Sequence, residues 1–270
     1  MIRNLRVFIV FALAAFGLEG MLAGGASAAT AASATSGADR LFLGFVEEAS
    51  IIQKQWWEGQ LEFTDGSPVD ATIFRAVVAI QPMSNLEVGG RVGFGSTDAP
   101  SPTPDGSGAT DLDVWGKWGL GTVGGDTDFS VGGVATVPTG DDTAGLGNDA
   151  FDVEAFGSLR HRLPSAVFAA NVGLRVNGDG QISGKSNSLK GKTSGILGAG
   201  IIFPVSDQVS LMGELRIETE RFDGADSDFR VLGGVNWRPF SRGILRGAVT
   251  VGLTDGAPDG QLTLGYAYTF

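Results

Sequence analysis

The chain contains no cysteine and a single histidine, His161. The first absence excludes disulfide bonds and cysteine-ligated metal sites. The second leaves one imidazole to serve as the base of a Ser-His-Asp arrangement, and no serine near it lies in a Gly-x-Ser-x-Gly motif. We interpret His161, which precedes the Leu163-Pro164 turn, as a residue without a catalytic role. We therefore expect a protein that is not an enzyme and that holds no cofactor and no metal.

Basic residues are also scarce, because 19 Lys and Arg stand against 30 Asp and Glu and give a formal charge of −11. Binding to nucleic acid requires a basic face that neutralises phosphates, so this balance excludes nucleic acid as a partner. Asp141, Asp142 and Asp149 offer oxygen ligands to a cation such as Ca²⁺. Their spacing differs from that of an EF-hand, and we interpret them as a solvated acidic loop.

Long apolar runs are missing as well, since no segment approaches the roughly 18 consecutive apolar residues of a membrane-spanning helix. Residues 7–18 form an apolar run of 12 residues after Arg3 and Arg6, and Ala26-Ser27-Ala28 follows as a small-residue cleavage site. This pattern predicts a secretory signal peptide at residues 1–28. A retained membrane anchor is the alternative. Cleavage would remove Arg3, Arg6 and Glu19 and take the charge from −11 to −12.

Residues 29–54 form an N-terminal segment that we place in the periplasm. Its first part is rich in Ala, Ser and Thr, and residues 41–52 are apolar apart from Glu47 and Glu48. A plug, a short helix and a lead-in to the first strand remain alternatives for this segment. Residues 55–270 form the third and largest region.

The last eleven residues, GQLTLGYAYTF, alternate strictly between large apolar and small or polar side chains. Successive side chains of a strand point to opposite faces, so this segment has one apolar face carrying Tyr266, Tyr268 and Phe270. An apolar outer face with aromatic residues is typical of a lipid-facing barrel strand, here one that ends on Phe270 and closes the barrel. An ordinary strand of a soluble β-sandwich is the alternative.

Twelve segments with this period-2 pattern follow one another along the chain. A strand of about 10 tilted residues spans the hydrocarbon core of a membrane, whereas strands of soluble proteins average about 5–6. The predicted strands are 56–64, 70–81, 86–95, 110–120, 127–138, 149–162, 166–177, 193–204, 208–220, 227–238, 243–254 and 260–270. They predict an all-β fold, a 12-stranded antiparallel up-and-down transmembrane β-barrel.

The connections between these strands alternate in length. Those after the even strands are mostly short, such as residues 82–85 and 163–165, whereas those after the odd strands are mostly long and polar, such as 96–109 and 178–192. Outer-membrane barrels have short periplasmic turns and long outer loops. The alternation therefore places both termini on the periplasmic side of a bacterial outer membrane.

Charged residues fall on the face opposite the apolar one in each strand. Because a charge facing the bilayer centre costs about 2–4 kcal/mol for Arg or Lys, we expect these residues to line the lumen. The set balances nine acids against nine bases: Glu58, Glu62, Arg75, Glu87, Arg91, Asp111, Asp113, Lys117, Asp152, Glu154, Arg160, Arg175, Glu214, Arg216, Glu218, Arg230, Arg238 and Arg246. Such a lumen can be a narrow pore, or a bore sealed by ion pairs that never conducts.

Aromatic residues divide between two roles. We expect Trp56, Trp57, Trp118, Trp237, Tyr266 and Tyr268 to form girdles at the membrane interfaces. Trp115 lies on the lumen face between Asp113 and Lys117, and we expect it to contact solutes. Lys185, Lys190 and Lys192 make one outer loop basic, which would attract anionic solutes or lipopolysaccharide phosphates.

Several motifs resemble the family of putative outer-membrane transporters of the meta-pathway of phenol degradation. They are Gln55-Trp56-Trp57-Glu58-Gly59, Gly108-Ala109-Thr110-Asp111-Leu112 with Gly116-Lys117-Trp118, and Pro138-Thr139-Gly140-Asp141 with Gly145-Leu146-Gly147. Thr110 departs from the pattern, which has a second glycine there. The resemblance covers roughly residues 55–270 and implies a 12-stranded barrel that takes up small, often aromatic, molecules.

These observations together predict an outer-membrane channel for passive or facilitated diffusion of small, in part aromatic or hydrophobic, solutes. We expect a monomer whose partners are membrane lipid, lipopolysaccharide, the solutes, and the barrel-assembly machinery acting on the strand that ends at Phe270. A non-conducting barrel with a structural or ligand-binding role and a secreted soluble all-β protein are the alternatives.

Overall fold

The structure is a computed structural model of the 270-residue chain and describes residues 47–53, 55–66, 69–100, 105–181 and 188–270. The predicted signal peptide and residues 29–46 lie outside the described residues. The described part contains no helix that is long and apolar enough to cross a membrane.

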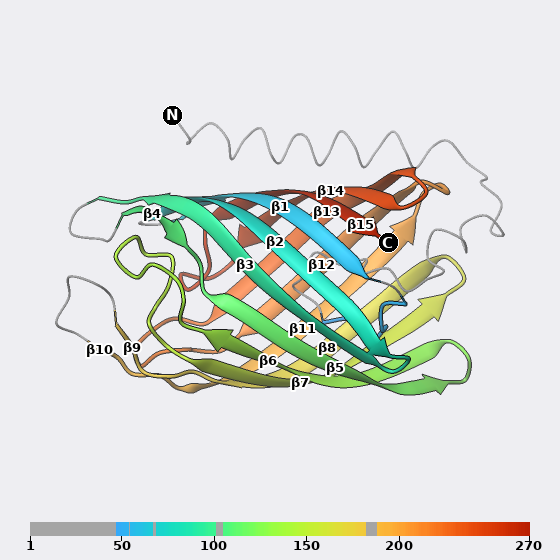
Figure 1. Cartoon of the computed structure of the whole chain (residues 1–270), viewed down its shortest axis with the longest axis horizontal. Helices are drawn as coiled ribbons and strands as arrows, with labels where there is room; N and C mark the ends of the chain where they lie inside the picture. Colours follow the sequence, from blue (N-terminus) through green and yellow to red (C-terminus); the bar gives the residue numbers. More distant parts are fainter. Residues whose placement is uncertain (1–46, 54, 67–68, 101–104, 182–187) are drawn as a thin grey trace.

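One closed antiparallel sheet forms the body of the protein (Figure 1). Its strands are β1 (Trp56–Asp65), β2 (Asp70–Met83), β3 (Leu86–Asp98), β4 (Gly106–Ala109), β5 (Leu112–Val123), β6 (Thr127–Val137), β7 (Asp152–Leu163), β8 (Ala166–Val176), β11 (Thr193–Pro204), β12 (Val209–Glu218), β13 (Asp228–Phe240), β14 (Gly243–Gly252) and β15 (Gly260–Thr269). A separate two-stranded sheet, β9 (Gly180–Gln181) and β10 (Ser188–Leu189), lies in the loop after β8.

Each long strand pairs with its neighbours in sequence, and β1 pairs with β15 from Trp56↔Thr269 to Asp65↔Gly260. This last pairing closes the sheet into a barrel. The short β4 and the longer β5 both pair with β3, at its two ends, and together they make one of the twelve barrel strands. The predicted twelve-stranded antiparallel barrel is therefore confirmed.

The break between β4 and β5 corrects the predicted strand at 110–120 and the predicted loop at 96–109. The chain leaves the ladder at Thr110, whose N–H donates to Gly93 O at 2.9 Å, while its side-chain Oγ1 accepts from Gly93 N at 2.9 Å. The hydroxyl takes the place of a missing backbone acceptor. The chain thus joins the sheet earlier than predicted, as β4, where a loop was expected. It then breaks at residues 110–111 before it continues as β5.

The connections sort to the two ends of the barrel. Short turns join β2 to β3, β7 to β8 and β13 to β14 at one end, and long loops join the strands at the other (Figure 1). The C-terminus lies at the short-turn end, where Phe270 N donates to Gln55 O at 3.1 Å. We refer below to the short-turn end and the long-loop end.

Burial alternates along the strands as the period-2 pattern predicts. In β7, for example, Glu154 and Arg160 are buried while Val153 is 47% exposed. Across the sheet, the exposed side chains are large and apolar, among them Phe74, Phe94, Leu174 and Trp237. A face of this kind suits a hydrocarbon environment, because apolar side chains gain nothing from contact with water.

Some close contacts on the inner face require glycine. A Cβ on Gly89 would lie 2.1 Å from the Trp115 ring, whereas a Cβ on Gly116, on the opposite face, would meet nothing within 4 Å. The indole of Trp115 therefore occupies the space that a side chain at position 89 would fill.

We predict that Gly89→Ala destabilises the barrel by about 1–3 kcal/mol, because the added methyl displaces the Trp115 ring from a filled interior. Gly116→Ala is the matched control and should have no such effect. The measurement is urea unfolding followed by the mobility shift of folded barrel on gels. Equal midpoints for the two variants would contradict the close contact.

Candidate functional site

Apart from Asp111, the predicted lining residues lie on the side of the strands opposite the exposed apolar face. Asp111 lies in the break before β5, where its Oδ1 accepts from Gly140 N at 2.9 Å. Eleven are buried and eight are half-buried: Glu58, Glu62, Glu87, Trp115, Lys117, Asp152, Glu154, Arg160, Glu214, Glu218 and Arg246, then Arg75, Arg91, Asp111, Asp113, Arg175, Arg216, Arg230 and Arg238. None of them is exposed, whereas many apolar residues of the same strands are. We interpret this face as the lining of the lumen.

Charges toward the long-loop end form a connected cluster on β7, β8 and β12. Arg175 bridges two acids, with Nη2 at 2.5 Å from Glu154 and Nη1 at 2.9 Å from Glu218. Glu218 also pairs with Arg216 at 2.9 Å, and Arg221 from the following loop pairs with Asp152 at 2.6 Å. Because Arg221 also lies 3.7 Å from Glu218, shared partners tie three strands of the wall and the loop after β12 together.

A second group of ion pairs lies on the wall made by β1, β2, β3 and β5. Arg75 holds Glu62 through two parallel hydrogen bonds of 3.0 Å each, which is the bidentate geometry that guanidinium favours. Arg91 contacts Asp113 at 2.5 Å, and Thr136 donates to the other oxygen of that carboxylate at 2.6 Å. Opposite charges predicted from the sequence thus meet as neighbours across the strands.

Three further pairs lie near the short-turn end and are almost completely buried. Lys117 lies 3.2 Å from Glu87, Arg160 lies 3.2 Å from Glu48, and Arg246 lies 3.4 Å from Glu58. Breaking a buried pair by removing one partner leaves a charge without compensation and is strongly destabilising. These pairs therefore fix the positions of the residues that they connect.

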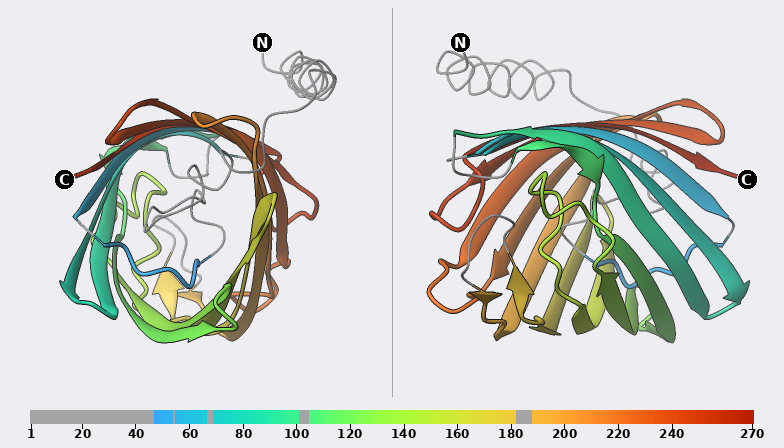
Figure 2. Two further views of the ribbon diagram at one scale, coloured as in Figure 1. Left: turned by 90° about the vertical axis from the view of Figure 1, so that its right-hand side faces the viewer. Right: turned by 60° about the vertical axis from the view of Figure 1, so that its left-hand side comes forward.

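Residues 47–53 cross the short-turn end inside the barrel (Figure 2). The Glu47 amide donates to Asn171 Oδ1 on β8 at 3.3 Å, and Glu48 pairs with Arg160 on β7. Farther along, the Ile52 amide donates to Glu87 Oε2 on β3 at 3.2 Å. The segment thus runs from the β7–β8 wall to the β3 wall, and its described residues contain no helix.

Apolar side chains also gather on the inner face, in two clusters. The first consists of Val167, Ala169, Ile202, Met212, Leu232 and Ala248, and the second of Ile52, Trp56, Val77, Ala79, Trp115, Ile244 and Ala267. Strand β14 contributes Ala248 to one cluster and Ile244 to the other, so both clusters lie along this strand. We call the two clusters together the apolar collar.

Trp56 corrects one of the sequence predictions. We expected it in an interfacial girdle, but it is 1% exposed, its Nε1 donates to Glu58 at 3.2 Å, and Arg246 lies over its ring at 5.2 Å. Trp56 and Trp57 are adjacent in a strand and must point to opposite faces. Trp57, at 37% exposure, is the one on the outer face.

Trp115 has a polar and an apolar contact that explain its place among charges. Its Nε1 donates to Glu87 Oε1 at 3.2 Å, and its ring belongs to the same cluster as Ile52. With residues 47–53 in place, Trp115 is 8% exposed. Its predicted contact with solutes remains a prediction and requires that this segment move.

The loop between β6 and β7 folds over the mouth at the long-loop end, which the sequence reading did not predict. Ala144, Leu146 and Ala150 are buried, and the Thr97 hydroxyl donates to Ala144 O. Asp141 accepts hydrogen bonds from Thr143 and Ala144, so it stabilises its own loop. Between this loop and the wall lies a cavity of 290 Å³ lined by Arg75, Asp113 and Leu146, among others.

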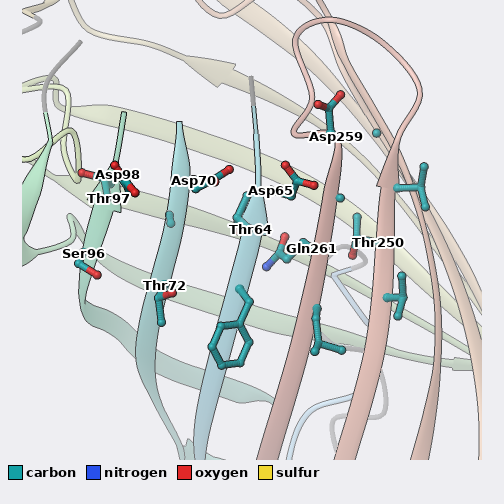
Figure 3. Close-up of a pocket in the computed structure, with 17 residues that line it drawn as sticks. Thr64, Asp65, Asp70, Thr72, Ser96, Thr97, Asp98, Thr250, Asp259 and Gln261 are labelled. Atoms are coloured by element: carbon teal, nitrogen blue, oxygen red, sulfur yellow. The ribbon is translucent and has the colours of Figure 1, made fainter. Parts of the chain in front are cut away.

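A larger pocket of 810 Å³ lies at the long-loop end of β1, β2, β3, β14 and β15 (Figure 3). Asp65, Asp70, Asp98 and Asp259 carry carboxylates around it. Its lining includes Phe63 and Leu262 from the outer face, so the pocket lies at the rim of the wall and not within the lumen lining. Its residues come from five strand ends, which no sequence pattern brings together.

Within the described part of the chain, no group of three His, Asp or Glu could hold a metal ion.

The outer loop that we predicted to be basic is partly neutralised by its neighbours. Lys192 Nζ lies 2.5 Å from Glu220 and 3.7 Å from Asp223, both in the next outer loop. Lys185 lies outside the described residues. The hydrogen bond from Lys192 lowers the pKa of the Glu220 carboxyl below its ordinary value of 4.5.

We predict that the tie between these two loops holds above about pH 4.5 and is lost as the pH falls through the lowered pKa of Glu220, because protonation removes the charge that Lys192 pairs with. The measurement is the rate of limited proteolysis of the two loops at falling pH. Glu220→Gln should be cleaved faster than the natural protein above the pKa of Glu220 and at the same rate below it. A pH dependence that survives in this variant would contradict the assignment.

The assignment of the lumen face is tested by single cysteines, since the natural chain has none. If position 216 faces water in the lumen, as we expect, Arg216→Cys should react with a membrane-impermeant thiol reagent in intact membranes. Leu211→Cys, on the opposite face of the same strand β12, should not react. Labelling at 211 without labelling at 216 would reverse the orientation.

The comparisons with known proteins bear on the fold. The chain matches no known protein-family profile and no curated protein sequence. Its structure is similar to the "COG4313 outer membrane channel from Pseudomonas putida F1", with a TM-score of 0.71 and 13% identity over 86% of this chain and 100% of that one. It is also similar to the KdgM porin in complex with disordered oligogalacturonate (TM-score 0.56, 9% identity, 80% and 99% covered) and to the NanC porin (TM-score 0.53, 8% identity, 79% and 100% covered).

These likenesses establish the barrel architecture of outer-membrane channels. The resemblance to the phenol meta-pathway family, which rests on short motifs, stays a prediction.

Proposed function

We propose that this protein is a bacterial outer-membrane channel through which small solutes, including aromatic or otherwise hydrophobic ones, cross by passive or facilitated diffusion. The observation that carries the proposal is the two-part lining of the lumen. An ion-pair cluster around Arg175 lies toward the long-loop end, and toward the short-turn end the apolar collar with Trp56 and Trp115 lies beside three buried ion pairs. A solute with polar and apolar parts meets a matching surface at each stage.

The similarity to outer-membrane channels supports the proposed location. In that location the short turns and both termini face the periplasm, the exposed apolar face meets lipid, and the barrel is a monomer. The assembly machinery acts on the strand that ends at Phe270, and the long loops contact lipopolysaccharide.

Residues 47–53 serve, in this proposal, as a plug at the periplasmic end. The Glu48–Arg160 pair, the hydrogen bond from Ile52 to Glu87 and the burial of Ala49 and Ile52 hold the segment across the bore. A lumen of about twelve strands lies between barrels that side chains fill and barrels that are open channels, so a segment of this size is enough to obstruct it.

A barrel that does not conduct, with a structural or ligand-binding role, is the second candidate. The deep burial of Lys117 and Glu87, at 2% and 0% exposure, favours it, because such pairs can close a narrow bore permanently. The two candidates differ in whether removing the segment opens a path for ions.

We predict that the full-length protein conducts rarely in a planar bilayer and that deletion of residues 29–54 gives steady single-channel conductance, because the plug is then absent. Glu48→Ala should raise the open probability, since Arg160 loses the partner that holds the segment. Gln53→Ala is the matched control, because its exposed side chain makes no contact that holds the segment.

Steady conductance of the full-length protein would show an open pore in which residues 47–53 do not act as a plug. Silence of all variants, with the fold verified by gel mobility, would favour the sealed barrel.

A further inference from the structure

Ile52 occupies a defined place in the apolar collar. Its side chain is 2% exposed and belongs to a cluster with Trp56, Val77, Trp115 and Ile244 on four barrel strands. All members of this cluster except Ile52 belong to the barrel wall. The wall therefore forms an apolar, aromatic-sided recess, and one side chain from outside the sheet fills it.

The same residue makes a polar contact at the edge of this recess. The Ile52 N–H donates to Glu87 Oε2 at 3.2 Å, while Trp115 Nε1 donates to the other oxygen of Glu87 at 3.2 Å. Lys117 pairs with Glu87 at 3.2 Å and balances its charge. Glu87 is 0% exposed, so it meets an incoming group as a buried acceptor.

Ile52 thus presents to the wall an apolar body with one hydrogen-bond donor beside it. A small molecule of the same kind would satisfy the same contacts: its body would contact the Trp56 and Trp115 rings, and its donor would reach Glu87. A carboxylate has no donor to offer Glu87, and it finds no spare positive charge at the recess, since Lys117 pairs with Glu87 and Arg246 pairs with Glu58. A molecule without a donor would not replace the hydrogen bond that the Ile52 N–H gives to the buried Glu87 carboxylate, and the loss of that bond lowers its affinity relative to a molecule with a donor.

We propose that the recess filled by Ile52 is a binding site for small neutral solutes with an aromatic body and one N–H or O–H donor, and that these solutes compete with residues 47–53 for it. The proposal rests on the proposed channel function and names the class of solute for that lumen. It also gives the plug a means of release, because a solute that takes the recess removes the contacts of Ile52.

The first test uses the full-length protein with one cysteine, Ala49→Cys, which reports on the segment because Ala49 is 2% exposed. We expect indole to raise the rate of labelling by a thiol reagent in a saturable way. 1-Methylindole, which is close in size but has no N–H donor, should have a markedly smaller effect. Ser194→Cys is the control, because Ser194 is 0% exposed on β11 near the long-loop end and should stay protected.

A second reporter covers the case in which the new cysteine itself loosens the segment. Ser50→Cys changes only oxygen to sulfur on a half-buried side chain, and its labelling should respond to indole in the same way. If neither reporter responds to indole, or if indole and 1-methylindole act equally, the proposed site is wrong.

The second test measures indole binding directly by calorimetry. Ile52→Ala removes most of the competing side chain, so we expect indole to bind on the order of tenfold more tightly or better. Ile51→Ala is the matched control, because the side chain of Ile51 lies next to Gly119 and outside the cluster. Equal affinities for the two variants would overturn the proposal.

Conductance separates this proposal from the function on which it rests. Opening of the pore on deletion of residues 29–54, without any effect of indole, would refute the solute site and leave the channel intact. Binding of indole with no conductance in any variant would refute the channel and leave a ligand-binding barrel.

Discussion

The pairing of β1 with β15 is the interaction on which the rest of the structure depends. It joins the two ends of the sheet from Trp56↔Thr269 to Asp65↔Gly260 and leaves no open edge among the twelve long strands. In hydrocarbon, a backbone polar group without a partner costs several kcal/mol, so a spanning sheet must close in this way. Closure also gives every strand one inner and one outer face.

The inner face then has to accommodate both charge and apolar bulk in a confined space. Charged side chains are accommodated by ion pairs with residues on other strands, such as Arg75 with Glu62 and Arg175 with Glu154 and Glu218. Apolar side chains are accommodated by contact with one another in the apolar collar. The cluster around Arg175 lies toward the long-loop end, whereas near the short-turn end the collar lies beside the buried pairs Lys117–Glu87 and Arg246–Glu58. In the proposed channel, such a lining offers polar and apolar contacts to the same solute.

The strands could be predicted from the sequence because period-2 alternation persists over ten or more residues and the turns between strands are short. The predicted and observed limits of β11 are identical, and those of β8 differ by one residue. The pairing of charges could also be predicted, since like parity on adjacent strands brings them together. The depth of each residue could not. The inward direction of Trp56 does follow from the sequence, because Trp56 has the same parity as Glu58 and Glu62, and the interfacial prediction neglected this alternation.

The features missed from the sequence are those that depend on irregular backbone. The break at Thr110 needs a hydroxyl in the place of a ladder acceptor, and the inward fold of the β6–β7 loop depends on contacts from Ala144 and Leu146 to distant strands. The path of residues 47–53 depends on Glu48 meeting Arg160, 112 positions away. No local pattern specifies such long-range partners.

The short distance in sequence between Ile52 and β1 has a consequence for how strongly a solute must bind. Ile52 is only four residues before Trp56, the first residue of β1, so the segment stays tethered at the edge of the recess after its contacts are lost. A tether of this kind holds a group at an effective concentration of the order of millimolar or higher. An incoming solute competes with that local concentration at every encounter, whatever the amount of protein in the membrane. The solute concentration at which half of the recesses are occupied would therefore depend on the length of the tether.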